Sequence, residues 1–426
     1  MKHRIPSIAL LSILTTFSPS LASAETEWTG WLGPERNGWV PGFQPPAQWP
    51  DQLQEIWRVK VGTGYGTSLV SGDRVYQHAR VGDNEVLWCL SLKTGDILWR
   101  QESLTPFKLG GGGEPHGKGP KSNPTLAKGR LFTMSISGKL SAFDASTGTP
   151  LWQQDYGARF GKPHPYWGAT TSPLVDDDQV VIHFGGDDEG LLVAFDVESG
   201  RERWSLGDDG AAYASPFIAE LFGVRQIVEW NHNALIGVES TTGRKLWEYA
   251  LPHRGTNQNM PTPSIHQGCI IVGGENRGIR SIQPRLRDGV WSVVENWHQK
   301  RLALDMSSAV VNGDFLFGFS HYRMGQLFCL DTANGEIVWE GPGRAGDNAT
   351  FLAIPKHVIA LLDDGELQIL ASESDQLEKI ATYTVSDAPT WAAPVLLDNG
   401  FLIKDRDTLT LWSLNRDIES LESPTR

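Results

Sequence analysis

The chain has 426 residues, with 50 acidic and 37 basic side chains and a formal net charge of −13 at pH 7. No basic stripe interrupts this acidic balance, so we expect neither nucleic-acid binding nor insertion into a membrane. Glycine (46 residues) and tryptophan (17 residues) are abundant. Such usage is typical of many short strands joined by tight turns, with one aromatic side chain in each repeated unit.

Residues 1–24 predict a cleaved secretory signal. A positively charged start is followed by the apolar stretch Ile8–Phe17 and by the small residues Ala22–Ala24 of a cleavage site. The apolar stretch is too short to span a bilayer, which takes about 20 residues. We therefore expect cleavage after Ala24 and export of the mature chain to the periplasm or the extracellular space.

The central signal is an internal repeat, in which a glycine stands four residues before a tryptophan. The pairs are Gly95/Trp99, Gly148/Trp152, Gly200/Trp204, Gly243/Trp247 and Gly335/Trp339. An acid or small polar residue precedes each glycine and can accept hydrogen bonds from the N–H groups of a turn, while the glycine allows a positive φ. Each segment therefore predicts a β-hairpin.

Another predicted strand pair lies upstream of each hairpin, so each unit has four antiparallel strands. The units recur at roughly 40 to 50 residues, which is the period of a propeller blade. The residues that close them are Trp57, Trp99, Trp152, Trp204, Trp247, Trp297, Trp339 and Tyr383. After the last of these only three strands remain, whereas strand 55–59 has no unit of its own.

Joining that N-terminal strand to the last three strands completes an eighth blade and removes an open sheet edge. We therefore predict an all-β, eight-bladed propeller of four-stranded antiparallel blades, with seven blades as the alternative. The expected organisation is a signal (1–24), an arm that packs on the propeller (25–54), a single monomeric propeller domain (55–416) and a disordered tail (417–426). Cys89 and Cys329 occupy the strand position that a small residue fills in other units, so no disulfide is expected.

The pattern Ala-Phe-Asp-x-x-Ser/Thr-Gly-x-x-x-Trp, as at 142–152, resembles the tryptophan-docking repeat of the pyrroloquinoline quinone (PQQ) dehydrogenases. The same repeat occurs in non-catalytic relatives, including the BamB-type outer-membrane assembly propellers, and the resemblance covers 57–414. It implies that the seven repeat tryptophans are structural and pack between blades. For the dehydrogenases it implies PQQ in the central channel, a Ca²⁺ held by Glu, Asn and Asp, and a disulfide between adjacent cysteines. This sequence has no adjacent cysteines.

A site is expected where the segments that enter the innermost strands converge on the channel. The predicted ligand-binding residues at this mouth are Tyr65, Lys121, Trp167, Tyr213, Asn259, Asp305, Asp347, Asn348 and Trp391. An aromatic-rich polar funnel suits sugars, quinones or peptides. Alternatively, these side chains plug the channel and satisfy one another. Two insertions, at 104–119 and 155–167, extend the same face.

These observations predict a non-catalytic binding module with no cofactor and no metal, whose partner is an unknown small molecule or an envelope protein. No catalytic residue can be assigned. One alternative is a dehydrogenase dependent on PQQ and Ca²⁺, which needs an acid and an amide together in the channel, for instance Asp305 with Asn259. The other alternative is an envelope assembly scaffold resembling BamB, which needs an exposed groove or sheet edge that accepts a strand.

Overall fold

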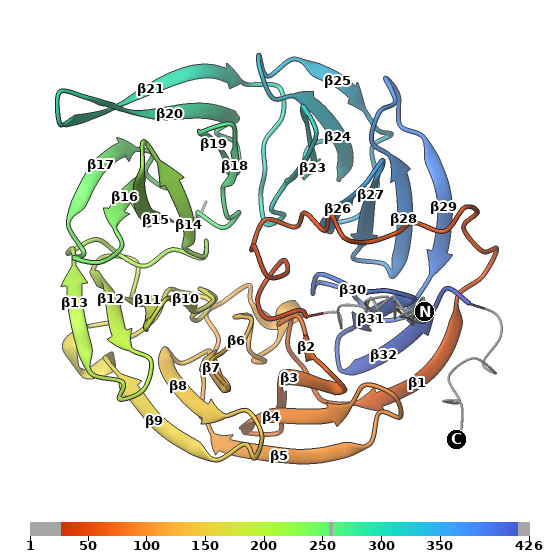
Figure 1. Cartoon of the computed structure of the whole chain (residues 1–426), viewed down its shortest axis with the longest axis horizontal. Coiled ribbons are helices and arrows are strands. Elements are labelled where there is room, and N and C mark those ends of the chain that lie inside the picture. Colours follow the sequence, from red (N-terminus) through yellow and green to blue (C-terminus); the bar gives the residue numbers. More distant parts are fainter. Residues whose placement is uncertain (1–26, 255–258, 416–426) are drawn as a thin grey trace, which may run out of the picture.

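The computed structural model describes residues 27–254 and 259–415. Within these residues, 32 strands form eight separate four-stranded sheets, each with all its strands antiparallel. The sheets stand as blades in a ring around a central channel (Figure 1). The prediction of an eight-bladed propeller is therefore confirmed, and the seven-bladed alternative is wrong.

Blades are numbered here in chain order, and within each blade the strands run from the channel to the outside. Blade 1 is β2 (Leu69–Ser71), β3 (Arg74–Val81), β4 (Asn84–Ser91) and β5 (Ile97–Leu104). Blade 2 is β6 (Thr125–Ala127), β7 (Arg130–Met134), β8 (Lys139–Asp144) and β9 (Pro150–Asp155). Blade 3 is β10 (Leu174–Asp176), β11 (Gln179–Gly185), β12 (Gly190–Asp196) and β13 (Glu202–Leu206). Blade 4 is β14 (Phe217–Leu221), β15 (Val224–Trp230), β16 (Ala234–Glu239) and β17 (Lys245–Ala250).

The second half of the ring repeats this arrangement. Blade 5 is β18 (Ser264–His266), β19 (Cys269–Gly273), β20 (Ile279–Arg287) and β21 (Val290–Gln299). Blade 6 is β22 (Val310–Asn312), β23 (Phe315–Ser320), β24 (Gln326–Asp331) and β25 (Ile337–Glu340). Blade 7 is β26 (Ala349–Ile354), β27 (His357–Leu362), β28 (Glu366–Ala371) and β29 (Lys379–Thr384). Blade 8 is β30 (Val395–Leu397), β31 (Gly400–Lys404), β32 (Thr408–Ser413) and β1 (Gln54–Lys60). Short 3₁₀ turns lie at η1 (Glu114–His116) and η2 (Gly157–Arg159).

The position of a strand in its blade decides its burial pattern. All seven residues of β11 are buried, because neighbouring blades cover both faces of the middle strands. The outer strand β13 alternates between exposed and half-buried residues, because solvent covers its outward side. This difference explains why the middle strands are continuous apolar runs whereas the outer strands are mixed.

Blade 8 contains both ends of the propeller domain. Strand β1 pairs antiparallel with β32, with Trp57 opposite Leu411, and a bulge lies between Glu55 and Trp57. The N-terminal strand therefore joins the last blade, as the sequence predicts. This pairing closes the ring, so that blade 8 is held by hydrogen bonds between strands that are more than 300 residues apart in the chain.

The repeat tryptophans fasten each blade to the next one. Four of their indole N–H groups donate to equivalent carbonyls in the next blade, namely Trp57 to Leu92 (2.8 Å), Trp152 to Val197 (3.0 Å), Trp204 to Ser240 (3.1 Å) and Trp297 to Thr332 (2.8 Å). The indole N–H groups of Trp99 and Trp339 have no partner in the described structure. Trp247 departs from this pattern and donates to Gln226 of its own blade at 2.7 Å. Trp247 faces blade 5, whose outer hairpin has no glycine at the repeat position, four residues before Trp297. Tyr383 occupies the tryptophan position in blade 7, and its hydroxyl donates to the carbonyl of Pro50 at 2.9 Å.

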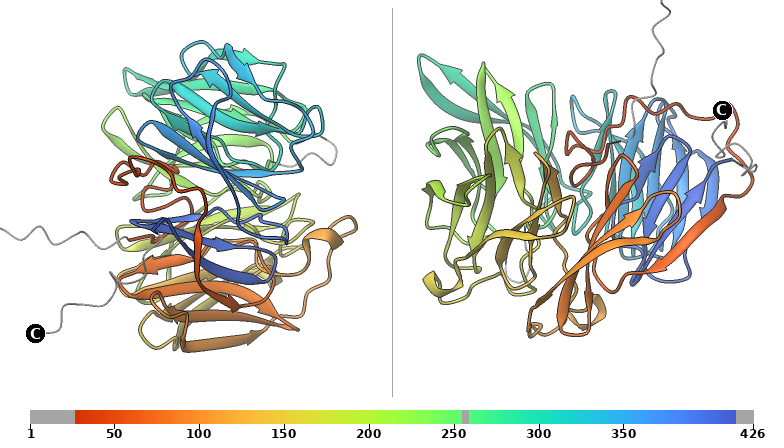
Figure 2. Two further views of the ribbon diagram at one scale, coloured as in Figure 1. Left: turned by 90° about the vertical axis from the view of Figure 1, so that its right-hand side faces the viewer. Right: turned by 60° about the horizontal axis from the view of Figure 1, so that its bottom comes forward.

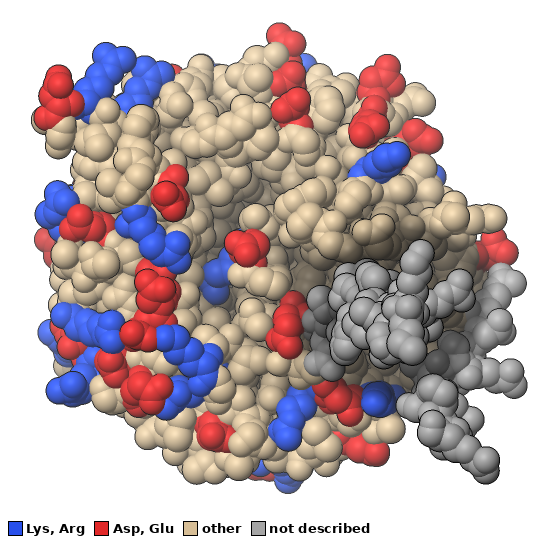
Figure 3. Space-filling view, in the orientation of Figure 1, with Lys and Arg blue, Asp and Glu red and all other residues tan. Residues whose placement is uncertain are grey.

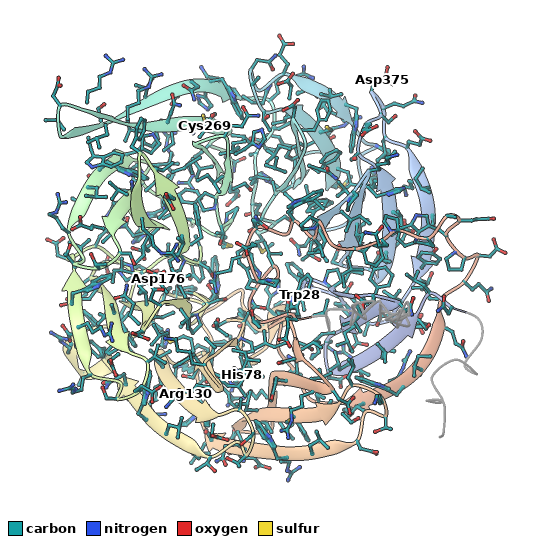
Figure 4. All side chains as sticks on the ribbon, viewed as in Figure 1. Trp28, His78, Arg130, Asp176, Cys269 and Asp375 are labelled. Carbon is teal, nitrogen blue, oxygen red and sulfur yellow. The ribbon has the colours of Figure 1, made fainter. Side chains whose placement is uncertain are left out.

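The described part of the N-terminal arm, residues 27–53, lies across one face of the ring (Figure 2). Trp28 makes an antiparallel bridge to Val70 of β2, and Trp39 makes a parallel bridge to Ala353 of β26. Arg36 is half-buried, and its guanidinium donates to the carbonyls of Pro173 (2.9 Å) and Ser172 (3.2 Å). Burial lowers the pKa of Arg36 to about 10. Figure 4 shows Trp28 near the centre of the ring, whereas Asp375 lies at its outer edge.

The predicted signal and the predicted C-terminal tail lie outside the described residues. All three cysteines are free, with Cys89 and Cys329 buried and Cys269 half-buried. In the part of the chain that the structure describes, no helix is long and apolar enough to cross a membrane.

Candidate binding site in the central channel

A cavity of about 590 Å³ lies in the central channel. Most of its lining comes from the segments that lead from the outer strand of one blade into the inner strand of the next. We call the face on which these segments lie the entry face. The arm lies on the opposite face and contributes Trp31 and Leu32 to the lining. The volume is within the range of about 300–1,000 Å³ that is usual for small-ligand sites.

Seen from the arm side, the centre of the ring is hollowed, and a few charged side chains surround the hollow (Figure 3). Seven of the predicted site residues line the cavity, namely Tyr65, Lys121, Trp167, Tyr213, Asp305, Asn348 and Trp391. The repeat register therefore identifies which segment of each unit reaches the channel.

Two predicted residues do not line this cavity. Asp347 lines a neighbouring cavity of about 400 Å³ that also contacts His116 and Trp391. Asn259 is fully buried, and its Nδ2 donates to the carbonyls of Asn231 (2.7 Å) and His232 (3.1 Å). Its amide therefore holds two loops of the propeller together.

Two pairs of aromatic rings form apolar walls on different sides of the cavity. The ring centroids of Tyr65 and Trp391 are 5.7 Å apart, and His116 stands edge-on to Trp391 at 4.6 Å. The ring centroids of Trp167 and Tyr213 are 5.9 Å apart, and the Tyr213 hydroxyl accepts a hydrogen bond from the Trp167 backbone N–H at 3.1 Å. Burial raises the pKa of both tyrosines, so each remains a neutral phenol at ordinary pH.

Lys121 supplies a partly desolvated positive charge. Its ammonium donates to the carbonyl of Trp167 at 3.1 Å, and within the described residues it has no ion pair with a carboxylate. Burial lowers the pKa of Lys121 to about 8. A neutral carbonyl does not compensate a buried ammonium as a carboxylate would, so this group retains the capacity to bind an anion.

Asp305 supplies negative charge elsewhere in the cavity. Burial is the main cause that raises its pKa, the carboxylate of Glu275 raises it further, and His321 lowers it. Glu275 also lines the cavity. The two acids therefore form a region of negative charge that becomes more stable when a cation approaches.

Two polar atoms of cavity-lining residues are buried and lack a hydrogen-bond partner in the described structure. They are Nε1 of Trp167, which can only donate, and Oγ1 of Thr350, which can donate or accept. Because buried polar groups are almost always paired, such atoms mark places where a bound molecule can hydrogen-bond. The predicted entry segment 347–350 ends at Thr350, which the structure places in β26, but Thr350 is not among the predicted ligand-binding residues.

The two insertions form one structure on the entry face, which we call the rim ridge and define as residues 105–119 and 156–167. The Gly111 N–H donates to the Tyr166 hydroxyl at 2.9 Å, and the rings of Phe107 and His164 lie 5.0 Å apart. A Cβ added at Gly110 would lie 2.6 Å from the Tyr166 ring. The glycine run therefore permits close packing between the insertions.

The pair of Asp305 with Asn259, which the sequence suggests for a Ca²⁺ and PQQ site, is not assembled in the cavity. Asn259 is directed elsewhere, and Oδ1 of Asn348 accepts a hydrogen bond from Ser307 at 2.6 Å. The described residues contain no group of three or more His, Cys, Asp or Glu side chains that could hold a metal ion. Glu275, Asp305 and Asn348 line the cavity, so the residue types of the Glu–Asn–Asp set are present, although the amide oxygen of Asn348 is already paired with Ser307.

Eight blades fastened by tryptophans, with the N-terminal strand in the last blade, define a propeller of the tryptophan-docking class. The family model described as "Outer membrane protein assembly factor BamB" matches residues 83–341. This match covers more than half of the chain, and the chain therefore belongs to this family.

Individual relatives include both assembly factors and dehydrogenases. BamB of Yersinia pestis is 23% identical over 300 residues, which are 66% of this chain and 71% of that protein. A quinohemoprotein alcohol dehydrogenase of Pseudomonas putida is 26% identical over 194 residues, which are 43% of this chain. The match spans 26% of that enzyme's length, and the match to BamB of Burkholderia pseudomallei spans 27%.

Solved structures show the same fold. BamB from Moraxella catarrhalis gives a TM-score of 0.61 at 15% identity and covers 86% of this chain and 98% of its own. Quinohemoprotein alcohol dehydrogenase from Comamonas testosteroni gives a TM-score of 0.69 at 13% identity and covers 94% of this chain and 82% of its own. At these identities the likeness concerns the fold alone.

Proposed function

We propose that this protein is a non-catalytic scaffold of the cell envelope that binds a partner polypeptide on its entry face. The observation that carries this proposal is the family match over 83–341, since the relatives are named outer membrane assembly factors. The amides of Asn348 and Asn259 are engaged with Ser307 and with backbone carbonyls, and this favours a binding role over dehydrogenase chemistry. Export and cleavage after Ala24 form part of the same proposal.

The rim ridge is the surface that we assign to the partner. Tyr166 is 50% exposed although its hydroxyl is fixed by Gly111. An exposed aromatic ring on a fixed support loses little conformational freedom on binding, and aromatic residues dominate the binding energy of many interfaces. The exposed side chains of Lys108 and Glu114 add a polar border to the ridge.

Strand β21 offers the other type of surface that a scaffold can use. It is an outer strand of ten residues, and Val290 at its start is 68% exposed. Such an edge can accept an added strand. The same experiment can compare the ridge with this edge, because the two surfaces lie on different blades.

Site-specific photo-crosslinking in intact cells tests the proposal. A photoreactive residue is placed at Lys108 or Glu114 on the ridge, at Val290 on the edge of β21, and at Asp375 on the outer rim as the control. We expect both ridge positions to give the same discrete adduct with an envelope protein and Asp375 to give none. An adduct from Val290 alone, or equal labelling at all positions, would overturn the assignment of the ridge. Sequencing the N-terminus of the mature protein tests export, with Glu25 as the expected first residue.

A further inference from the structure

We infer that the channel cavity is a second binding site, for a small zwitterion with an apolar body, namely a short peptide with both ends free. This inference goes beyond the scaffold proposal, which concerns the rim ridge. It rests on where the ring places the charges, the aromatic walls and the unpartnered polar atoms of the cavity.

The two kinds of charge lie on opposite sides of the channel. Lys121 precedes β6 and lies between blades 1 and 2, whereas Asp305 precedes β22 and lies between blades 5 and 6. The two segments are four blades apart in a ring of eight, so they lie directly opposite each other. Neither side chain has an ion-pair partner within the described residues. A molecule with a carboxylate at one end and an ammonium at the other would compensate both charges.

The aromatic pairs occupy the two remaining sides of the channel. Trp167 and Tyr213 come from the segments before blades 3 and 4, and Tyr65 and Trp391 from the segments before blades 1 and 8. The body of the ligand would therefore lie between two aromatic walls, with Met306 among the other apolar residues that line the cavity. Burying apolar surface there contributes roughly 25 cal/mol for each Å².

The two unpartnered polar atoms lie on the same sides of the cavity as the two charges. Trp167 Nε1 belongs to the residue whose carbonyl accepts from Lys121, and it can donate a second hydrogen bond to a carboxylate oxygen. Thr350 Oγ1 lies in blade 7, one blade beyond the blade that Asp305 precedes, and it can accept a hydrogen bond from an ammonium. A donor therefore accompanies the positive side of the cavity, and an acceptor accompanies the negative side.

This arrangement discriminates between ligand classes. A dicarboxylate would bring its second negative charge to Asp305, and a diamine would bring its second positive charge to Lys121. In a partly desolvated site, the repulsion between two like charges would weaken the binding of either ligand. A neutral sugar would leave both protein charges uncompensated. An extended dipeptide or tripeptide spans about 7 to 10 Å, at about 3.4 Å for each residue.

Isothermal titration calorimetry on the mature protein tests the inference, with phenylalanine and Phe-Phe as zwitterions. The matched ligands are N-acetyl-Phe-Phe, which lacks the positive end, and Phe-Phe amide, which lacks the negative end. We expect each blocked peptide to bind at least ten-fold more weakly than Phe-Phe. Phenylalanine should bind more weakly than Phe-Phe, because its ammonium and carboxylate lie on the same carbon and cannot reach both sides of the channel.

Variants then assign each end of the ligand. Lys121→Met should weaken Phe-Phe and N-acetyl-Phe-Phe by ten-fold or more and leave Phe-Phe amide unchanged, and Lys121→Arg should restore most of the affinity. Asp305→Asn should weaken Phe-Phe amide in the same way. Lys118→Met, which changes an exposed lysine of the same segment, should leave all affinities unchanged.

Several outcomes would overturn the inference. They are the absence of binding for both zwitterions at millimolar concentration, equal binding of blocked and free peptides, or stoichiometric stabilisation by PQQ with Ca²⁺ that a chelator removes. The first two outcomes leave the scaffold proposal standing, because crosslinking from Glu114 does not depend on the cavity. Conversely, loss of the crosslinks with retained peptide binding would reject the scaffold proposal alone.

Discussion

The indole of Trp152 lies directly against the backbone of Gly200 in the next blade. A Cβ added at Gly200 would lie 2.6 Å from Cδ2 of Trp152, and the indole N–H donates to the carbonyl of Val197 at 3.0 Å. Gly200 also has a φ of +67°, in the left-handed region. The glycine of each repeat is therefore required for two reasons. Its turn needs a left-handed backbone conformation, and the tryptophan of the preceding blade leaves no room for a side chain.

Replacing this glycine should destabilise the propeller strongly. Gly200→Ala should lower the free energy of unfolding by about 2–5 kcal/mol, because the left-handed conformation costs a non-glycine residue about 1–2 kcal/mol and overpacking costs about 1–3 kcal/mol. Equilibrium unfolding in urea measures this change.

Gly129→Ala is the matched control for Gly200→Ala. Gly129 lies in a turn with a φ of +71°, but nothing lies within 4 Å of an added Cβ. Only the conformational cost applies, so the expected loss is about 1–2 kcal/mol. Equal losses in the two variants would show that the contact with Trp152 adds no constraint.

The indole hydrogen bond can be separated from the ring packing. Trp152→Phe leaves the Val197 carbonyl without its donor, whereas Trp99→Phe removes an indole N–H that has no partner. Both changes remove the same ring atoms from equivalent positions. We expect Trp152→Phe to cost about 1 kcal/mol more than Trp99→Phe in urea unfolding. A larger loss for Trp99→Phe would contradict this assignment.

The fold could be predicted from the sequence because the blade is a local structure. The turn residues that precede Gly148 or Gly200 act within their own hairpin, and the repeat period then supplies the ring. The closure of blade 8 could be predicted by counting strands, because the last unit had only three strands and strand 55–59 had no unit of its own. Tyr383 and Trp297, which close degenerate units, still occupy the expected outer strands β29 and β21.

The site could be predicted only in part. The repeat register identifies entry segments, and it therefore placed Lys121 and Trp391 at the channel, where they line the cavity. It does not give side-chain direction, which is why Asn259 proved to be buried against backbone carbonyls. Glu275 comes from the β19–β20 connection, and Trp31 comes from the arm. Neither belongs to an entry segment, so the repeat contained no signal for them.

Lys121 should destabilise the unliganded protein. Its pKa of about 8 in the folded state is below the ordinary value of 10.5, so folding disfavours its protonated form. This cost is fully present below about pH 8 and disappears above pH 10.5. Lys121→Met should therefore stabilise the protein at pH 7 by on the order of 1–3 kcal/mol, and by less at pH 10. Thermal unfolding at the two pH values measures the effect.

The exposed Lys118 provides the control, because Lys118→Met should change stability little at either pH. A stabilisation by Lys121→Met that is the same at pH 7 and pH 10 would indicate better apolar packing rather than removal of a charge. Such a result would also weaken the case for an anion-binding role of the lysine.

A buried ion pair between blades 3 and 4 gives the fold its own pH dependence. His183 and Glu229 are buried and in contact through Nδ1 and Oε1, and His183 Nε2 lies 3.0 Å from the carbonyl of Asp209. Both ring nitrogens thus face acceptors, which only the protonated imidazolium satisfies. Burial lowers the pKa of His183, but the charge and hydrogen bond of Glu229 outweigh burial and raise it above 6.5.

Because the folded pKa is raised, the stabilisation is fully present below about pH 6.5 and is lost as the pH rises through the folded pKa. Glu229→Gln removes the charge that holds the proton, and breaking a buried pair costs about 3–5 kcal/mol. We expect that loss at pH 5.5 and a clearly smaller loss at pH 9, measured by urea unfolding. Glu248→Gln is the control, because Glu248 and its exposed ion-pair partner Lys245 line the same surface pocket as His183 and Glu229. Breaking this exposed pair should cost less than about 1 kcal/mol at either pH. If Glu229→Gln cost the same at both pH values, His183 would be neutral in the folded protein and the blades would be joined by a hydrogen bond alone.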